Sequence, residues 1–117
     1  MVSQAERDDI RIGHMLDAIA GVRATVGSEE MATVFADWTR ARAIERGYEI
    51  ISEASRHVSD NAKATEPQID WRWIAGIWNV LRHDHDGVEI SILFRAIAAE
   101  FPVLEAALLR MRARLMP

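Results

Sequence analysis

Apolar residues recur with the period of an α-helix through most of this chain, and no other feature constrains its fold as strongly. The clearest example follows Asp70, whose side chain can cap the start of a helix. The apolar residues after it have the i, i+3, i+4, i+7 spacing of one buried face: Ile74, Ile77, Trp78 and Leu81. No segment alternates polar and apolar residues for long, as a half-buried strand does. The pattern therefore predicts an all-α fold, an up-and-down bundle of about four to six helices.

Start and stop signals divide the periodic pattern into separate helices. We expect helices over residues 4–26, 28–36, 38–58, 71 to about 82, 88–100 and 102–115. Ser28 and Asp37 are predicted N-caps, and Pro102 suits a first helical turn. Polar residues and a proline over 59–68 predict a surface loop. Gly47, inside a predicted helix, indicates a close contact with another helix.

The apolar stripes of these helices predict which side chains are buried. Trp38, Ile92 and Tyr48, the only tyrosine, are among the residues expected to face the core. His14 and His57 are expected on helix surfaces or in satisfied core contacts rather than in a reaction site.

The composition bounds the class of protein. A length of 117 residues predicts one domain, because two would each lack a sufficient core. Cysteine is absent, which excludes disulfides, thiolate metal sites and a cysteine nucleophile. The net charge of −4 is unlike that of a general nucleic-acid binder, so any RNA contact has to be local. The charged N-terminus and the lack of a long apolar run predict no signal peptide, no membrane span and a cytoplasmic location.

Ionisable side chains gather at the C-terminal end of the helix that follows Asp70. They are Arg82, His83, Asp84, His85 and Asp86. A helix C-terminus carries partial negative charge, which favours arginine and protonated histidine there. Imidazole and carboxylate groups are also metal ligands, but adjacent residues at a helix end cannot easily all point to one centre. We therefore expect a polar site here without a bound metal.

Four stretches of the chain, by their order and spacing, resemble one protein family. They are His14-Met15-Leu16-Asp17-Ala18-Ile19, Ile50-Ile51-Ser52-Glu53-Ala54-Ser55, Ile69-Asp70-Trp71 with Ile74-Ala75-Gly76, and Phe101-Pro102-Val103-Leu104. The family is that of the HepT-like proteins of the HEPN superfamily, proposed ribonuclease toxins paired with minimal nucleotidyltransferase antitoxins. The resemblance covers nearly the whole chain, so residues 1–117 are expected to form a single HepT-like helical domain.

This resemblance implies an activity and an assembly. Family members are thought to cleave RNA as metal-independent endoribonucleases, without a cofactor, in toxin-antitoxin systems. The 2′-hydroxyl of the RNA attacks the adjacent phosphate, a histidine transfers a proton, and an arginine stabilises charge on the phosphate. The resemblance further implies a homodimer whose two signature helices face a shared cleft, and a minimal nucleotidyltransferase antitoxin as partner.

The family signature is R-N-x-x-x-H-x-Y, and this chain matches it in part. Asn79 and His83 match, whereas Trp78 stands where the arginine is expected and His85 where the tyrosine is expected. His83 is therefore the predicted proton-transfer group, and His85 can take the hydrogen-bonding role of the tyrosine or lie in an exposed turn. Losing a group like the arginine commonly costs about 10²–10³ in rate, so a weakened or inactive enzyme is expected. Adenylylation of the signature tyrosine, known in related systems, has no phenol to act on at His85.

Two further residues are candidates to complete the site. Arg82 follows Trp78 by about one helical turn, and its long side chain can supply the missing guanidinium from a shifted origin. The alternative is a solvated residue that complements the helix dipole. Glu53 matches an acidic position of the family and can orient His83 or Arg82, or it can face solvent.

Three functions stay open at this point. The first is an RNA-cleaving toxin with a displaced arginine, and the second is a catalytically silent dimer that still binds a nucleotidyltransferase. The third, independent of the resemblance, is a helical interaction module that uses its apolar stripes and four tryptophans for subunit contacts. Trp71, Trp73 and Trp78 can also form a base-stacking platform, although Trp78 belongs to the predicted buried stripe.

Overall fold

The computed structural model describes the backbone of residues 1–83 and 87–115, and the side chains of residues 1–82 and 91–115. Within this part the chain forms seven helices and no strand, which confirms the all-α prediction. The helices are α1 (Gln4–Val26), α2 (Met31–Phe35), α3 (Trp38–His57), α4 (Asp60–Ala64), α5 (Trp71–His83), α6 (Gly87–Ala98) and α7 (Phe101–Leu115). The number exceeds the prediction because the expected loop over 59–68 contains α4, whose start is capped by the Ser59 hydroxyl.

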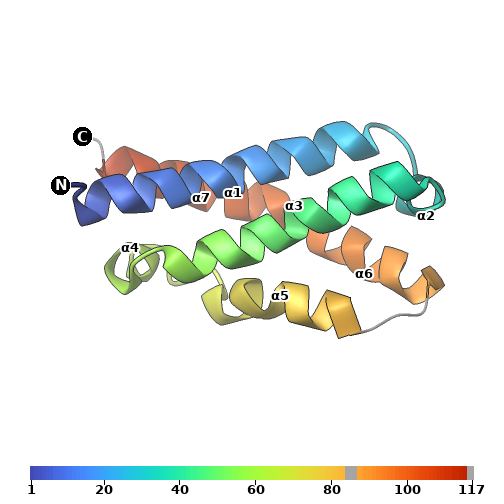
Figure 1. The fold of residues 1–117 in the computed structure, drawn as a ribbon. Helices are drawn as coiled ribbons and strands as arrows, with labels where there is room; N and C mark the ends of the chain where they lie inside the picture. Colours follow the sequence, from blue (N-terminus) through green and yellow to red (C-terminus); the bar gives the residue numbers. More distant parts are fainter. Residues whose placement is uncertain (84–86, 116–117) are drawn as a thin grey trace.

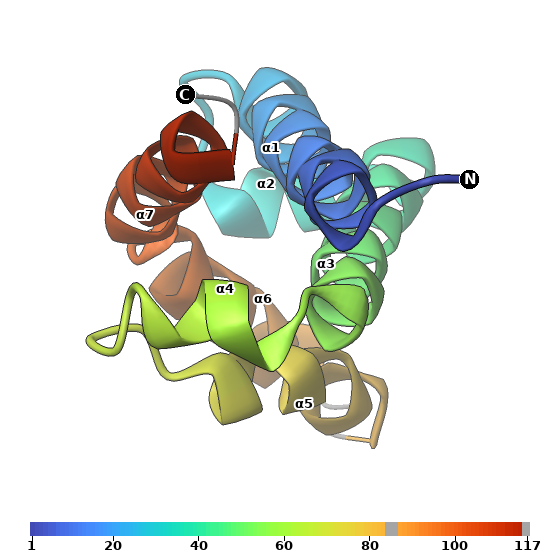
Figure 2. The same ribbon diagram turned by 90° about the vertical axis from the view of Figure 1, so that its left-hand side faces the viewer.

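The long helices run up and down along one axis of the molecule (Figure 1). Helices α1 and α3 are antiparallel neighbours, and α5 lies against α3 in the opposite direction to it. Helix α7 returns along α1, so the start of α1 and the end of α7 lie at the same end of the bundle (Figures 1 and 2). Helices α2 and α6 pack together. In the described part of the chain, no helix combines the length and the apolar character needed to cross a membrane.

Local capping follows the sequence in two of three places. Asp37 accepts a hydrogen bond from the Arg40 amide at 3.2 Å, and Asp70 accepts one from the Trp73 amide at 3.0 Å, so both predicted N-caps are confirmed. The Ser28 prediction is wrong, because α2 begins only at Met31 and its N-cap residue makes no side-chain hydrogen bond. The residues after α1 form a turn instead, which starts at Gly27 with φ of +58°.

Tyr48 lies at the centre of the core, as predicted. Its side chain is almost fully buried and its hydroxyl donates a hydrogen bond to the Phe94 carbonyl at 2.7 Å, which joins α3 to α6. The ring centroid lies 4.6 Å from that of Phe94 and 5.4 Å from that of Phe101. Burial raises the pKa of the Tyr48 hydroxyl, so this group stays neutral and serves packing.

Two apolar side chains that were expected in the core are exposed to solvent. Trp38 is 71% exposed because it is the first residue of α3, and the Arg42 guanidinium lies 5.6 Å from its ring centroid. Ile92 is 52% exposed. Helix α6 has apolar residues around more than one face, and Phe94 occupies the core instead, so the periodicity could not fully define the inner face.

Gly47 allows the close approach of α3 and α1. A Cβ atom at this position would lie 2.5 Å from Cγ2 of Val22, closer than packed atoms tolerate. The predicted role of Gly47 in a close helix contact is therefore confirmed, and this contact fixes how the two helices present their outer side chains.

A buried carboxylate joins the segment between α4 and α5 to α7. The Glu66 side chain is 3% exposed and accepts hydrogen bonds from Arg110 and Arg114, each with a closest N–O distance of 2.5 Å. These hydrogen bonds, that of Arg110 above all, hold the pKa of Glu66 at about 2. We call these three residues the Glu66 cluster.

Candidate functional site

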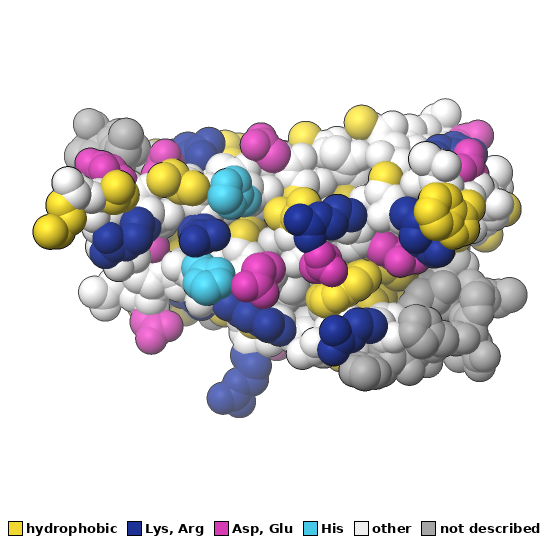
Figure 3. Space-filling view, viewed as in Figure 1, with side chains coloured by type: hydrophobic (Ala, Val, Ile, Leu, Met, Phe, Trp, Pro, Cys, Tyr) yellow, Lys and Arg dark blue, Asp and Glu magenta, His cyan; other side chains and the backbone are white. Residues whose placement is uncertain are grey.

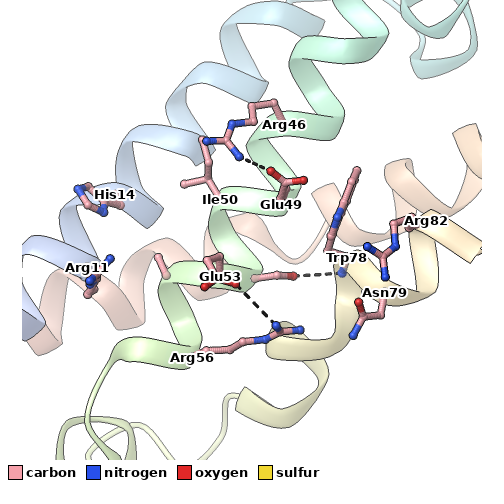
Figure 4. Close-up of a pocket in the computed structure, with 12 residues that line it drawn as sticks. Arg11, His14, Arg46, Glu49, Ile50, Glu53, Arg56, Trp78, Asn79 and Arg82 are labelled. Carbon is pink, nitrogen blue, oxygen red and sulfur yellow. Dashed lines mark hydrogen bonds and ion pairs between the residues drawn. The ribbon is translucent and has the colours of Figure 1, made fainter.

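Helices α1, α3 and α5 line an open groove of about 440 Å³ (Figure 4). The lining residues are Arg11 and His14 of α1, Arg46, Glu49, Ile50, Ser52, Glu53, Ala54 and Arg56 of α3, and Trp78, Asn79 and Arg82 of α5. Four arginines face two glutamates here, so the groove is locally basic although the whole chain has a net charge of −4. Figure 3 shows cationic, acidic and histidine side chains side by side on this face of the molecule. A local basic site is what an RNA contact on an acidic protein requires.

Hydrogen bonds between α3 and α5 fix two walls of the groove. The buried Ser52 hydroxyl donates to the Ile74 carbonyl at 2.9 Å and accepts from the Trp78 amide at 3.1 Å. The Arg56 guanidinium donates to the Ala75 carbonyl from both Nε, at 3.1 Å, and Nη2, at 2.8 Å. These bonds hold α5 in register with α3 from Ile74 to Trp78, so the groove-lining side chains of α5 have a rigid base.

The four groove arginines differ in how they are paired. Arg46 forms an ion pair with Glu49, and Arg56 lies 3.6 Å from Glu53 besides its bonds to the α5 backbone. Arg11 and Arg82 make no hydrogen bond or ion pair with any residue whose side chain the structure describes. A guanidinium in a basic groove without a protein carboxylate is available for an anionic ligand.

Three predicted site residues meet in the groove. Asn79 and Arg82 line it from α5 and Glu53 lines it from α3 (Figure 4). Glu53 pairs there with residues of its own helix, with Arg56 and with His57 Nε2 at 3.1 Å. Its role in orienting Arg82 or His83 across the groove stays a prediction.

The predicted histidines lie at and beyond the end of α5. His83 is the last residue of α5, one helical turn after Asn79, and its side chain lies outside the described part. His85, with its neighbours Asp84 and Asp86, lies outside the described residues altogether. Elsewhere in the chain, across the described residues, no three His, Asp or Glu side chains are grouped as a metal site requires.

Sequence reasoning missed the part of the groove that α1 and the arginines of α3 provide. Arg11, His14, Arg46 and Arg56 had no predicted role in a site. Their spacing gave a signal, since Arg11 and His14 are three residues apart on α1, and Arg46 and Arg56 share one side of α3 with Glu49 and Glu53. The same spacing is ordinary for a solvated helix face. Only the packing of the helices therefore distinguishes a site from a solvated surface.

Trp78 differs in position from its predicted role. It was expected in the core, whereas its side chain is only partly buried and lines the groove beside Arg82. Trp71, by contrast, packs against the core and donates its indole N–H to the carbonyls of Lys63 and Glu66. Among the tryptophans of α5, Trp78 alone is a groove residue in the described part of the chain.

Comparisons with known proteins point to one family. The family model described as ribonuclease HepT-like matches residues 15–111. A protein of Thermococcus cleftensis named probable ribonuclease HepT is 31% identical over 70 residues, which are 60% of this chain and 64% of the relative. A putative RNase of Methanocaldococcus jannaschii is 29% identical over 63 residues, 54% of this chain and 58% of that protein. A putative RNase of Caldanaerobacter subterraneus is 34% identical over 64 residues, 55% of this chain and 57% of that protein.

These matches cover parts of the proteins concerned. The chain spans about three fifths of the length of each curated relative it matches, from 57% to 64%. No solved structure shows a significant match.

Proposed function

Because this chain belongs to the ribonuclease HepT-like family, we propose that it binds RNA in the groove between α1, α3 and α5 and cleaves it there without a metal ion. One observation carries the proposal: the groove that contains Asn79 of the signature also contains two arginines, Arg11 and Arg82, without a carboxylate partner among the described residues. Guanidinium groups bind phosphate oxygens in a bidentate way, and RNA presents one phosphate per nucleotide.

The proposed reaction is an intramolecular transfer. The 2′-hydroxyl oxygen attacks the adjacent phosphorus while its proton goes to a base, and the bond from phosphorus to the 5′-oxygen breaks. The products are a 2′,3′-cyclic phosphate and a 5′-hydroxyl, which receives a proton. His83, at the end of α5, is the proposed proton-transfer group, with His85 as a hydrogen-bonding group nearby in sequence.

Arg82 is the proposed replacement for the signature arginine. Position 78 holds a tryptophan, but Arg82 follows it by one turn of α5, lines the same groove and is exposed. A guanidinium that starts one turn later reaches the phosphate with a different geometry. We therefore expect cleavage to be slow, in line with the loss of about 10²–10³ in rate when an electrostatic group of this kind is missing.

The assembly is part of the same proposal. We propose a homodimer in which the ends of two α5 helices face one cleft, and a role as the toxin of a toxin-antitoxin pair with a minimal nucleotidyltransferase. Family membership supports both.

One observation favours a second candidate, a catalytically silent relative that binds RNA or a nucleotidyltransferase without cleavage. Trp78 carries no charge to stabilise the phosphate in the transition state, and it occupies the signature position in the groove itself.

An RNA cleavage assay in the presence of a metal chelator separates these functions. The wild-type protein, purified without a histidine tag, is compared with His83→Ala, and RNA binding is measured in parallel. We expect chelator-resistant cleavage that falls at least about 100-fold in His83→Ala while RNA affinity changes little. Equal cleavage by both proteins would remove His83 from the mechanism. Binding without cleavage would establish the silent relative, and neither binding nor cleavage would reject an RNA function for this groove.

A further inference from the structure

We propose that Trp78 forms a nucleobase-binding subsite, in which its indole stacks on an unpaired base of the RNA strand held in the groove. The inference rests on the RNA binding proposed above and deepens it, because it names the residue that holds a base and the state of the substrate. A base is free to stack on a side chain only where the strand is single, so the groove would take single-stranded RNA.

The position of the indole supports this role. Trp78 packs against the core with part of its side chain, and the remainder lines the groove. Figure 4 shows the indole standing between Glu49 of α3 and the guanidinium of Arg82 on α5. The Trp78 amide is held at 3.1 Å by the buried Ser52 hydroxyl, so the ring projects from a fixed point of α5. A stacking platform needs such a rigid base.

The chemistry beside the ring fits a nucleotide rather than an apolar ligand. Arg82 lies one helical turn from Trp78 and has no partner among the described residues, and Arg56 lines the same groove. A base on the indole would therefore share the groove with two arginines that can bind its flanking phosphates. This combination of an aromatic face with a basic groove is the general design of single-strand binding sites.

Trp38 provides an internal contrast. It is also exposed, at 71%, and also lies beside an arginine, but the Arg42 guanidinium already occupies its ring and neither residue lines the groove. An exposed tryptophan next to an arginine is therefore not sufficient for the proposal. The distinguishing features of Trp78 are its place in the groove and the neighbouring Arg82, which has no partner among the residues whose side chains are described.

The test measures affinity for two strands that differ only in their bases. One is a single-stranded 2′-O-methyl oligonucleotide, which cannot be cleaved because the attacking hydroxyl is blocked, and the other is the same backbone with abasic residues. The proteins are the wild type, Trp78→Leu, Trp78→Phe and the control Trp38→Leu, each with its thermal unfolding recorded.

We expect Trp78→Leu to weaken binding of the base-containing strand by about 5- to 100-fold and to leave the abasic strand unchanged. Trp78→Phe should retain most of the affinity, and Trp38→Leu should bind both strands as the wild type does. An equal loss on both strands, or no loss on either, would overturn the proposal. If the wild type binds neither strand, the RNA function itself fails, whereas binding that is indifferent to Trp78 rejects only the base subsite.

A second measurement needs no variant and covers the case that Trp78→Leu does not fold. The wild-type protein is irradiated with a single strand that contains 4-thiouridine, digested with trypsin, and the cross-linked residue is identified by mass spectrometry. The proposal requires a cross-link at Trp78. Cross-links confined to other residues would contradict it.

Discussion

The Glu66 cluster and the groove use arginine in opposite ways. In the Glu66 cluster, Arg110 and Arg114 both bind one carboxylate that is 3% exposed. In the groove, Arg11 and Arg82 line the same walls as two glutamates, yet neither forms an ion pair with a described residue. In the Glu66 cluster the charges are paired within the protein. In the groove, two arginines without a described partner are available to an anionic ligand.

The difference indicates that the Glu66 cluster stabilises the fold and that the groove arginines are available to bind a ligand. A buried carboxylate costs free energy unless cations and hydrogen bonds compensate it, so removing one partner of the Glu66 cluster should destabilise the fold. An exposed arginine without a partner contributes little to stability, and its removal should affect only what it binds. Substitutions in the two regions should therefore separate the free energy of unfolding from RNA affinity and cleavage.

The largest effect is expected for Arg82→Ala. If Arg82 supplies the displaced guanidinium, RNA cleavage should fall by about 10²–10³, while the free energy of unfolding stays within about 0.5 kcal/mol of the wild type. Single-turnover cleavage rates and denaturant unfolding measure the two quantities.

Arg72→Ala is the matched control, since Arg72 is an exposed arginine of the same helix that does not line the groove. It should leave the cleavage rate unchanged. Equal rates in the wild type and Arg82→Ala would return Arg82 to the role of a solvated helix-end residue.

A loss of stability is expected for Glu66→Gln, which removes the charge but keeps the shape. The free energy of unfolding at pH 7 should fall by about 2 kcal/mol, because hydrogen bonds to charged groups are replaced by weaker ones, while RNA affinity stays unchanged. The pKa of Glu66 is about 2 in the folded protein, below its ordinary value of 4.5. The stabilisation is therefore complete above about pH 4.5 and is lost as the pH falls through 2.

Urea unfolding at a series of pH values tests both statements. The wild type should lose stability between pH 4.5 and 2 more steeply than Glu66→Gln. Glu105→Gln removes the exposed ion pair with Arg23 and should change stability by less than about 0.5 kcal/mol. Parallel pH curves for the wild type and Glu66→Gln would show that Glu66 is not the group that titrates.

The smallest effect is expected for Arg11→Ala. Removing one phosphate contact at the rim of the groove should weaken RNA binding several-fold and lower the slope of log affinity against log salt by about 0.7. Stability should not change measurably. Arg7→Ala, one turn earlier on α1 and outside the groove, should leave the salt slope unchanged, and an equal slope in all three proteins would exclude Arg11 from RNA contact.

The sequence was sufficient to predict structural features that depend only on residues close together in the chain. The helical period and the absence of alternating segments predicted the all-α fold, and side-chain oxygens predicted the caps at Asp37 and Asp70. It failed on two expected core residues, because a period does not show that Trp38, the first residue of its helix, lies outside the core, and it cannot choose between two apolar faces around Ile92.

The sequence by itself determined the family and the order of helices, because a motif such as Asn79 with His83, and a spacing such as that of Ile74, Ile77 and Leu81, are properties of one continuous segment. Only the tertiary structure decided that Arg11, far away in the chain, shares a groove with Arg82. The reason is physical: the groove exists where α1, α3 and α5 pack side by side, and the close contact at Gly47 sets the distance between two of these helices.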